Sequence, residues 1–197
     1  FGFESFASGN GLEQLLINFA NEQLQQLFSA QVIAAELRLF ADEGIAMEGG
    51  AAAALAAAPD NSRCVELLVG AGPPAGLLRL LDATCEAPGE PTDDKFVADA
   101  HRAHGRHPCF PRTHPTDKRD KFGVAPYAET VVYTVDGWLA ANRDAKPDAL
   151  VALLGERGAP LLREACAAAA PPKGARRKPE TVCGGFVGSM VGLRRVL

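Results

Sequence analysis

A long amphipathic stretch from Gly11 to about Glu43 constrains the fold of this chain more than any other feature of its sequence. Apolar residues recur along it at helical spacing, and Gln, Asn and Glu occupy the remaining faces. About 33 residues at roughly 1.5 Å each would form a rod about 50 Å long. Asn10 and Glu13 have the spacing of an N-cap and its capping-box partner, so we expect the helix to begin there. On periodicity alone, a long helix in a protein core is the simplest interpretation.

Composition places the chain among ordinary globular domains. It has 197 residues, of which 47% are hydrophobic and 22% are charged, and such a chain can bury a sizeable core. The net charge of −4 is spread over both signs, which argues against a nucleic-acid binder with its strongly basic face. No apolar run reaches the roughly 18 residues that would indicate a membrane span.

The cysteines and the first residue bear on the compartment and on the reading frame. Five cysteines stand at wide, irregular spacings without a C-x-x-C pair, so a secreted disulfide framework is not indicated and a reducing, intracellular compartment fits better. They are Cys64, Cys85, Cys109, Cys166 and Cys183. Because the chain begins at Phe1 without an initiator Met, we expect a truncated reading frame.

The order of residues at the start of the chain is more specific than its periodicity. The sequences FGFESF at 1–6, NGLEQL at 10–15 and INFANEQLQQLF at 17–28 meet nearly every fixed position of one known pattern. They resemble the end of switch II (1–6) and the relay helix (10–43) of the myosin motor head. Leu12, where the family has Phe, is a mild departure.

This resemblance implies roles for several residues near the N-terminus. In the family, the switch II Gly donates its backbone N–H to the γ-phosphate of the nucleotide, and the switch II Glu pairs with an Arg of switch I. Gly2 and Glu4 match these two catalytic positions. The nucleotide-sensing set implied by the resemblance is Phe1, Gly2, Phe3, Glu4 and Asn21. Without the resemblance, Glu4 and Asn21 would be read as ordinary solvated side chains.

The segment from Pro74 to His104 predicts two helices separated by a loop, because Pro88, Gly89 and Pro91 cannot lie in one continuous helix. Taken alone, it is an αα-hairpin with a solvated turn. It also resembles the helix-loop-helix (74–104) with which myosins bind actin. The implied actin-binding residues here are Pro74, Glu86, Ala87 and Pro88.

Two of these residues depart from the family pattern. Glu86 and Ala87 stand where larger apolar residues are common in the family. Because burying an unpaired carboxylate is costly, we expect either weaker strong-state binding or a basic partner on the actin side.

The region between the rod and this segment departs further. Met47 stands at a usual Trp position, and Ala51 to Ala58 are almost pure alanine, which supplies little packing surface. A short helix should follow, capped by Asn61 or Ser62.

The second half of the chain predicts a small sheet, further helices and a basic loop. Alternating apolar residues indicate a β-hairpin at 122–135, and Trp138 is most simply a core residue. Helices are expected from Pro147 and around Leu161, and a last helix at 181–197. The Pro/Ala-rich stretch 167–180 matches the position of the family's basic surface loop, which contacts acidic residues of actin. Its implied actin-binding residues are Lys173, Arg176, Arg177 and Lys178.

A metal or hydrolase site is the main competing chemistry in the sequence. His101, His104, His107 and Cys109 lie close together, but no second ligand pair with zinc-site spacing accompanies them. The resemblance already accounts for His104 and His107, so we expect no metal site. No nucleophile motif of the G-x-S-x-G kind is present either.

The resemblance implies an α-rich α+β fold, part of the P-loop NTPase-type myosin head and its lower actin-binding subdomain. The implied function is part of an ATP-driven, actin-based motor, in which switch II is coupled to actin binding. ATP and Mg²⁺ would bind through parts absent from this chain, which has no phosphate loop, switch I or converter. Implied partners are actin filaments and calmodulin-like light chains on a lever arm, at the cytoplasmic actin cytoskeleton. Two alternatives stay open: an inactive, actin-anchoring head or scaffold, and an unrelated helical interaction module.

Overall fold

The computed structural model describes residues 2–45, 60–114, 119–143, 148–168 and 181–196. These residues form an α-rich fold with one two-stranded antiparallel sheet, as the sequence predicts. Met47, the alanines at 51–58 and the four basic residues expected to bind actin at 173–178 lie outside the described residues.

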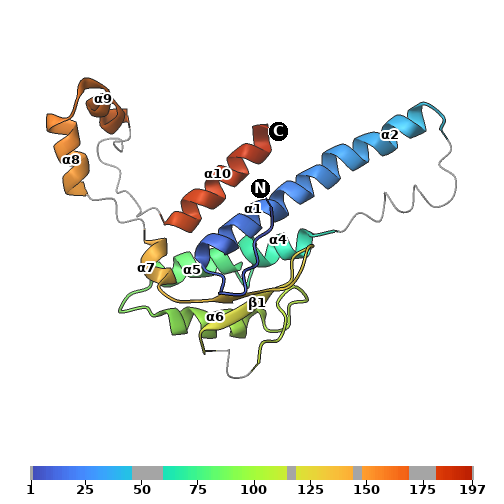
Figure 1. Cartoon of the computed structure of the whole chain (residues 1–197), viewed down its shortest axis with the longest axis horizontal. Coiled ribbons are helices and arrows are strands. Elements are labelled where there is room, and N and C mark those ends of the chain that lie inside the picture. Colours follow the sequence, from blue (N-terminus) through green and yellow to red (C-terminus); the bar gives the residue numbers. More distant parts are fainter. Residues whose placement is uncertain (1, 46–59, 115–118, 144–147, 169–180, 197) are drawn as a thin grey trace.

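The predicted rod is present, in three parts that follow one another along a common direction (Figure 1). Helix α1 covers Leu12–Phe28, a π-helical segment η1 covers Ser29–Ile33, and α2 covers Ala34–Asp42. A π-helical turn inside an α-helix is rare and often marks a functional position. The rod therefore has a defined irregularity near its middle.

The predicted N-terminal cap of the rod is wrong. The N-cap is Gly11, not Asn10, and the side chain that reaches back to it is Gln14, not Glu13. Gln14 Oε1 accepts the Gly11 N–H at 2.9 Å. The Asn10 amide is buried and is used elsewhere, because it donates to the carbonyl of Val132 at 3.1 Å.

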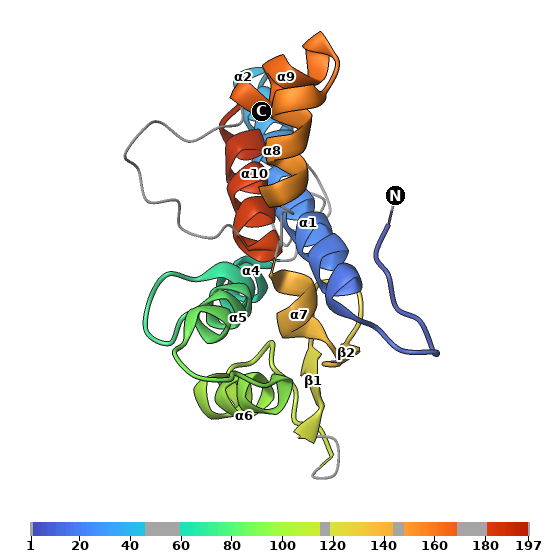
Figure 2. The same ribbon diagram turned by 90° about the vertical axis from the view of Figure 1, so that its left-hand side faces the viewer.

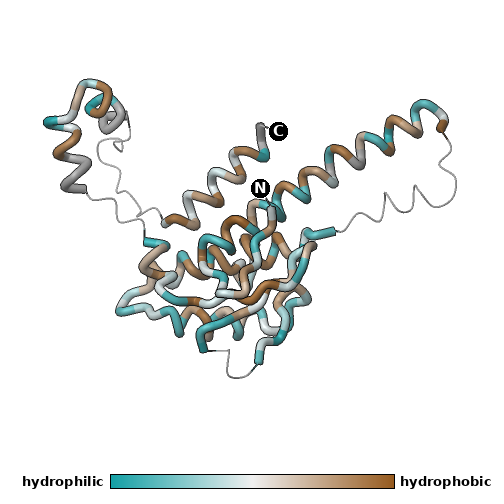
Figure 3. The backbone as a smooth tube through the Cα atoms, viewed as in Figure 1, coloured by the Kyte–Doolittle hydropathy of each residue, from teal (hydrophilic) through white to brown (hydrophobic). Residues whose placement is uncertain are grey.

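The rod is anchored at its first part and projects away from the body at its second (Figure 1). Leu12, Leu15, Leu16 and Phe19 of α1 are buried in the core. Along the rod, polar and apolar residues alternate as far as the end of α2 (Figure 3), where Leu39 is half exposed. The amphipathic pattern thus continues beyond the region where the described chain covers it.

The expected helix-loop-helix consists of α5, Leu77–Glu86, and α6, Asp93–His104. The loop between them contains Gly89 with a φ of 99°, a backbone conformation that favours glycine. Thr92 caps α6, because its hydroxyl oxygen accepts the Lys95 N–H at 3.3 Å.

The hairpin pairs β1, Lys121–Val124, with β2, Val131–Thr134, in antiparallel register. Phe122 lies opposite Tyr133, and the alternating apolar residues are all buried, as the pattern predicts: Phe122, Val124, Val131 and Tyr133. Trp138, in the short helix α7 at Trp138–Asn142, packs on the same core, with its ring centroid 5.6 Å from that of Phe122. The hairpin thus joins the helix-loop-helix to α1 through one hydrophobic core.

Helix α4, Ser62–Val69, follows the alanine-rich region. Asn61 occupies its N-cap position, but the cap bond comes from neither predicted residue. Asp60 Oδ1 accepts the Ser62 N–H at 2.9 Å, while the Asn61 amide donates to Glu22. The long-range bond to Glu22 explains why Asn61 does not cap its own helix.

Three further helices complete the described chain: α8 at Asp148–Arg157, α9 at Pro160–Ala168 and α10 at Val182–Val196. Helix α10 packs along α1, as both views show (Figures 1 and 2). Helices α8 and α9 pack on each other and stand off from the body in Figure 1. Within the described ranges, no helix combines the length and apolar character needed to cross a bilayer.

Candidate functional site

The segment at residues 2–6 is held against α1 by two asparagines one helical turn apart. Asn18 Oδ1 accepts the Glu4 N–H at 2.7 Å, and Asn18 Nδ2 donates to the Glu4 carbonyl at 2.7 Å. Asn21 Nδ2 donates to the Gly2 carbonyl at 3.0 Å. The backbone of the predicted nucleotide-sensing segment is therefore fixed in register with the rod.

Asn18 also reaches the hairpin. It is buried, and its Nδ2 donates to the Tyr133 hydroxyl at 2.8 Å. Desolvation raises the pKa of the Tyr133 hydroxyl, so the group stays neutral. One amide thus connects residues 2–6, α1 and β2.

Gly2 and Glu4, the two predicted catalytic positions, differ in their surroundings. Gly2 is exposed, and a Cβ added there would meet no heavy atom within 4 Å in the described part of the chain. The backbone face at Gly2 is therefore accessible to a ligand. The Glu4 side chain is half-buried, and Gln14 Nε2 donates to its carboxylate at 3.4 Å.

Of the remaining predicted sensing residues, Phe3 is half-buried and packs against the hydrophobic core. Phe1 lies outside the described residues. The structure thus brings Gly2 into contact with Asn21, in the middle of α1, and holds Glu4 on Asn18 one turn earlier.

A buried carboxyl group at Glu22 is the main feature that sequence reasoning missed. Its side chain has no exposed surface. Oε2 accepts the Asn61 amide at 2.8 Å and Oε1 accepts the Tyr127 N–H at 3.0 Å. Asn61 also donates to the Glu22 carbonyl at 2.7 Å, which fixes α4 to α1.

Desolvation by burial raises the pKa of Glu22, although the hydrogen bonds from Tyr127, Asn61 and Cys64 oppose the shift. A signal for this burial was available in the sequence. Glu22 stands three residues after Phe19 and seven after Leu15, and both of these lie on the apolar face of the helix.

The structure separates the residues predicted to bind actin through the helix-loop-helix. Glu86, Ala87 and Pro88 lie together at the end of α5, where Glu86 and Pro88 are exposed and Ala87 is half-buried. Pro74 precedes the other end of α5, about 15 Å away for a helix of this length. It lines a hollow of about 130 Å³ together with His104 and His107.

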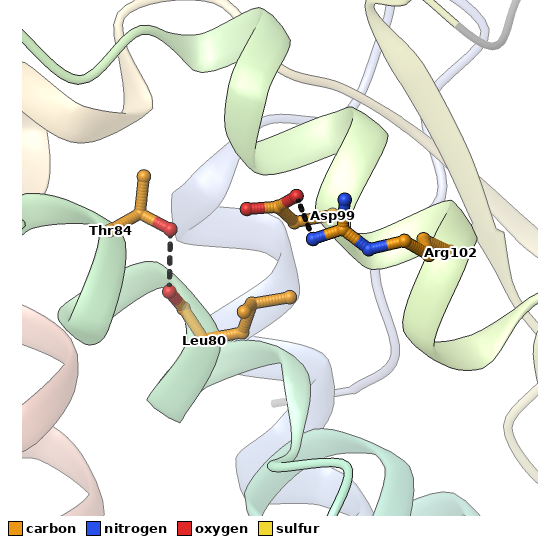
Figure 4. Close-up of polar contacts among 4 residues, drawn as sticks. All are labelled: Leu80, Thr84, Asp99 and Arg102. Carbon is orange, nitrogen blue, oxygen red and sulfur yellow. Dashed lines mark hydrogen bonds and ion pairs between the residues drawn. The ribbon is translucent and has the colours of Figure 1, made fainter.

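Two polar contacts of this segment each lie within a single helix (Figure 4). The buried Thr84 donates its hydroxyl to the Leu80 carbonyl at 2.8 Å in α5. Arg102 pairs with Asp99 at 2.6 Å on α6, with the Arg102 side chain largely exposed. These contacts stabilise each helix on its own and do not join the two.

The histidines near the end of α6 are occupied by contacts within the chain. His104 Nε2 lies 2.9 Å from the Ala75 carbonyl, His101 Nε2 lies 2.9 Å from the Lys121 carbonyl, and His107 Nδ1 accepts the Cys109 N–H at 3.2 Å. Burial lowers the pKa of His104 and of His107. Among the described residues, no group of three or more His, Cys, Asp or Glu side chains could hold a metal ion.

A basic hollow lies beside these histidines and was not predicted. It has a volume of about 630 Å³. Its lining includes His101, Arg102, Arg106, Phe110, Arg112 and Thr113. The clustering of basic residues after position 101 in the sequence was the available signal.

Comparison with known proteins identifies the family. The family model of the myosin head (motor domain) matches residues 1–181. This chain belongs to the myosin head family. Residues 2–4, which Asn18 and Asn21 hold on α1, thus lie within the matched part of the myosin head.

Individual myosins agree with this assignment. The myosin head segment is 38% identical over 144 residues to myosin IC heavy chain from Acanthamoeba castellanii, covering 73% of the segment and 11% of that protein. It is 39% identical over 155 residues to mouse Myosin-14, covering 78% and 7%, and 36% identical over 150 residues to mouse unconventional myosin-Ig, covering 73% and 14%. The chain therefore spans only about a tenth of the length of the relatives it matches.

Proposed function

We propose that this myosin head segment transmits the state of a bound nucleotide from residues 2–4 to an actin-binding surface. The observation that supports this most directly is the pair of amide contacts from Asn18 and Asn21 to the backbone of Glu4 and Gly2. A change in the position of Gly2 would have to displace α1 or break these hydrogen bonds. Coupling between distant sites requires an element with two discrete arrangements, and in this proposal residues 2–4 and α1 form it.

The path onward from α1 runs through Glu22. Its bonds to Asn61 hold α4 on α1, and α4 packs in turn on α5, the first helix of the helix-loop-helix. In this proposal, Glu86, Ala87 and Pro88 at the exposed loop contact actin together with the basic residues at 173–178. Pro74 is exposed before the first turn of α5, at the opposite end of that helix from the loop.

The other parts of the proposal concern the longer protein. Gly2 would donate its N–H to the terminal phosphate of ATP, and Glu4 would pair with a basic residue supplied from outside this chain. ATP and Mg²⁺ would bind mainly through that outside part. Actin filaments are the proposed partner, calmodulin-like light chains would bind a lever arm, and the protein would work at the cytoplasmic actin cytoskeleton.

The test replaces Asn21 with Ala in the motor head that contains this chain. Among the described hydrogen bonds, the one from the Asn21 side-chain amide to the Gly2 carbonyl joins these two residues, and Asn21→Ala removes it. We therefore expect actin activation of ATP hydrolysis to fall at least fivefold. A roughly 1 kcal/mol hydrogen bond corresponds to about this factor. Steady-state hydrolysis measured with and without actin filaments gives the result.

Gln25→Ala is the matched control, because Gln25 lies one turn further along α1 and its amide contacts only Ser29 at 3.5 Å among the described bonds. It should leave actin activation unchanged. Equal actin activation in the Asn21→Ala and Gln25→Ala heads would overturn the proposal. A head that binds actin but hydrolyses no ATP in either form would point to the anchoring alternative.

A further inference from the structure

Asn142, the last residue of α7, joins three helices through one completely buried amide. Its Nδ2 donates to Asp82 Oδ1 of α5 at 2.9 Å, and also to Cys85 Sγ of the same helix at 3.6 Å. Its Oδ1 accepts the Cys183 N–H, in the first turn of α10, at 2.8 Å. The amide therefore uses both its donor and its acceptor groups on neighbouring helices.

The start of α10 lies directly against the first helix of the helix-loop-helix, as both views show (Figures 1 and 2). The first N–H groups of a helix have no acceptor within the helix. Asn142 supplies one for Cys183, and Thr181 Oγ1 accepts the Gly184 N–H at 3.0 Å. A Cβ added at Gly184 would lie 3.4 Å from Asp82 Oδ2, so the backbone of α10 is in contact distance of α5.

Helix α10 lies in turn on the rod. The ring centroid of Phe186, in α10, is 6.3 Å from that of Phe19, a buried residue of α1. Helix α5 thus has two connections to α1 among the described residues. One passes through α4, which Glu22 and Asn61 fix to α1, and the other passes through α10, which Asn142 fixes to α5.

We propose that Asn142 is a positioning residue for the coupling between the rod and the helix-loop-helix. It holds the second half of α5 on α10, so that a displacement of α1 carried by α10 reaches the loop after Glu86. Glu86 follows Asp82 by four residues, which is about one helical turn of roughly 6 Å. This inference rests on the proposed function. Because Asn142 is buried, it acts through Asp82 and Cys183 and contacts no partner itself.

A simple helix cap would not need the bond to Asp82. Capping the first turn of α10 uses only the amide oxygen of Asn142, which accepts the Cys183 N–H. The bond from Nδ2 to the Asp82 carboxylate leads instead to a different helix, and hydrogen bonds to an ionised group are among the stronger ones. That bond is the part of the contact that a test has to change.

The test uses the motor head that contains this chain. Asn142→Asp keeps an oxygen for the Cys183 N–H but sets a second carboxylate against Asp82. The double variant Asn142→Asp/Asp82→Asn exchanges the two groups, so the bond can form in the opposite direction. In the single variant we expect amide hydrogen exchange at residues 182–186 to be about tenfold faster, and actin activation of ATP hydrolysis to fall about fivefold. The double variant should recover most of both.

Ala141→Asp is the matched control, because it adds the same charge to α7 at an exposed neighbouring position. It should leave hydrogen exchange and actin activation unchanged. If Asn142→Asp does not fold, Asp82→Ala removes the same bond at its half-buried end and should give the same loss of actin activation.

Three results would overturn the inference: equal behaviour of the Asn142→Asp and Ala141→Asp heads, no recovery in the double variant, or faster exchange without any loss of actin activation. The proposed function is tested separately by Asn21→Ala, which leaves the contacts of Asn142 in place. Loss of actin activation in the Asn21→Ala head together with any of these three results would reject the role of Asn142 alone.

Discussion

Glu22 has a carboxyl group without exposed surface, and its two oxygens accept hydrogen bonds from residues 39 and 105 positions away in the sequence. Burial disfavours the charged form, so the pKa of Glu22 is raised above its ordinary value of 4.5. The stabilising contribution of a carboxyl group with a raised pKa is complete below the pKa of the unfolded chain. It is lost as the pH rises through the pKa of the folded chain.

The Glu22→Gln substitution tests this at the residue scale. The oxygen of the introduced amide could still accept the Tyr127 N–H, but its NH₂ group would oppose that of Asn61, so we expect a loss of about 1–3 kcal/mol in the free energy of unfolding at pH 5. The loss should become smaller at pH 8, where the native carboxylate is itself destabilised. Urea unfolding at both pH values measures the difference. Glu13→Gln, an exposed change on the same helix, should show no such pH dependence, and equal behaviour of the two variants would contradict the argument.

The burial of Glu22 could have been predicted, and its partners could not. Helical spacing from Leu15 and Phe19 places Glu22 on the apolar face. Asn61 and Tyr127, however, reach it only because α4 and the segment after β1 fold against α1. For Asn10, the local sequence pattern gave a wrong prediction. Its local pattern is that of an N-cap, but a long-range bond to Val132 gives its amide a different use.

At the scale of elements, Asp93 joins the second helix of the helix-loop-helix to α7. Its carboxylate accepts the N–H of Trp138 at 3.2 Å and that of Leu139 at 3.0 Å, which satisfies two donors in the first turn of α7. Because Trp138 is buried in the hydrophobic core, these two bonds position a large buried side chain as well as the first turn of α7.

Asp93→Ala should therefore lower the free energy of unfolding by about 1–3 kcal/mol, since it leaves two partly buried N–H groups without their acceptor. Asp94→Ala is the matched control. Asp94 is the next residue in the same first turn and is exposed, so the two substitutions share the loss of a negative charge at the helix N-terminus. The difference between the two variants in chemical denaturation isolates the bonds to α7. No difference would mean that Asp93 acts only through its charge.

The elements themselves were largely predictable, because each has a local signal. Pro88, Gly89 and Pro91 separate α5 from α6, and alternation at 122–124 and 131–133 marks the hairpin. The π-helical segment at Ser29–Ile33 was not predicted. Its sequence, Ser-Ala-Gln-Val-Ile, has no proline or glycine, the residues that usually mark an irregularity inside a helix.

At the scale of the whole molecule, the net charge of −4 conceals a local concentration of positive charge in the stretch 167–180. On the proposed function, a chain with a net negative charge repels an acidic filament over long distances, so productive encounter would depend on a basic stretch that the filament meets first. Interactions of this kind are weakened by salt, because the Debye length falls from about 10 Å at 0.1 M to about 3 Å at 1 M ionic strength.

We therefore expect that replacing Lys173, Arg176, Arg177 and Lys178 with Gln, in the head that contains this chain, will slow association with actin filaments about tenfold at low salt. The same change should remove most of the salt dependence of that rate, because fewer charges remain to be screened. Stopped-flow association rates from 25 to 300 mM KCl, roughly the range over which screening becomes strong, would measure both effects. Replacing four exposed arginines elsewhere, Arg38, Arg157, Arg163 and Arg194, removes the same charge and should have a much smaller effect. If both sets of substitutions reduced the salt dependence equally, overall charge rather than the basic stretch 167–180 would govern the encounter.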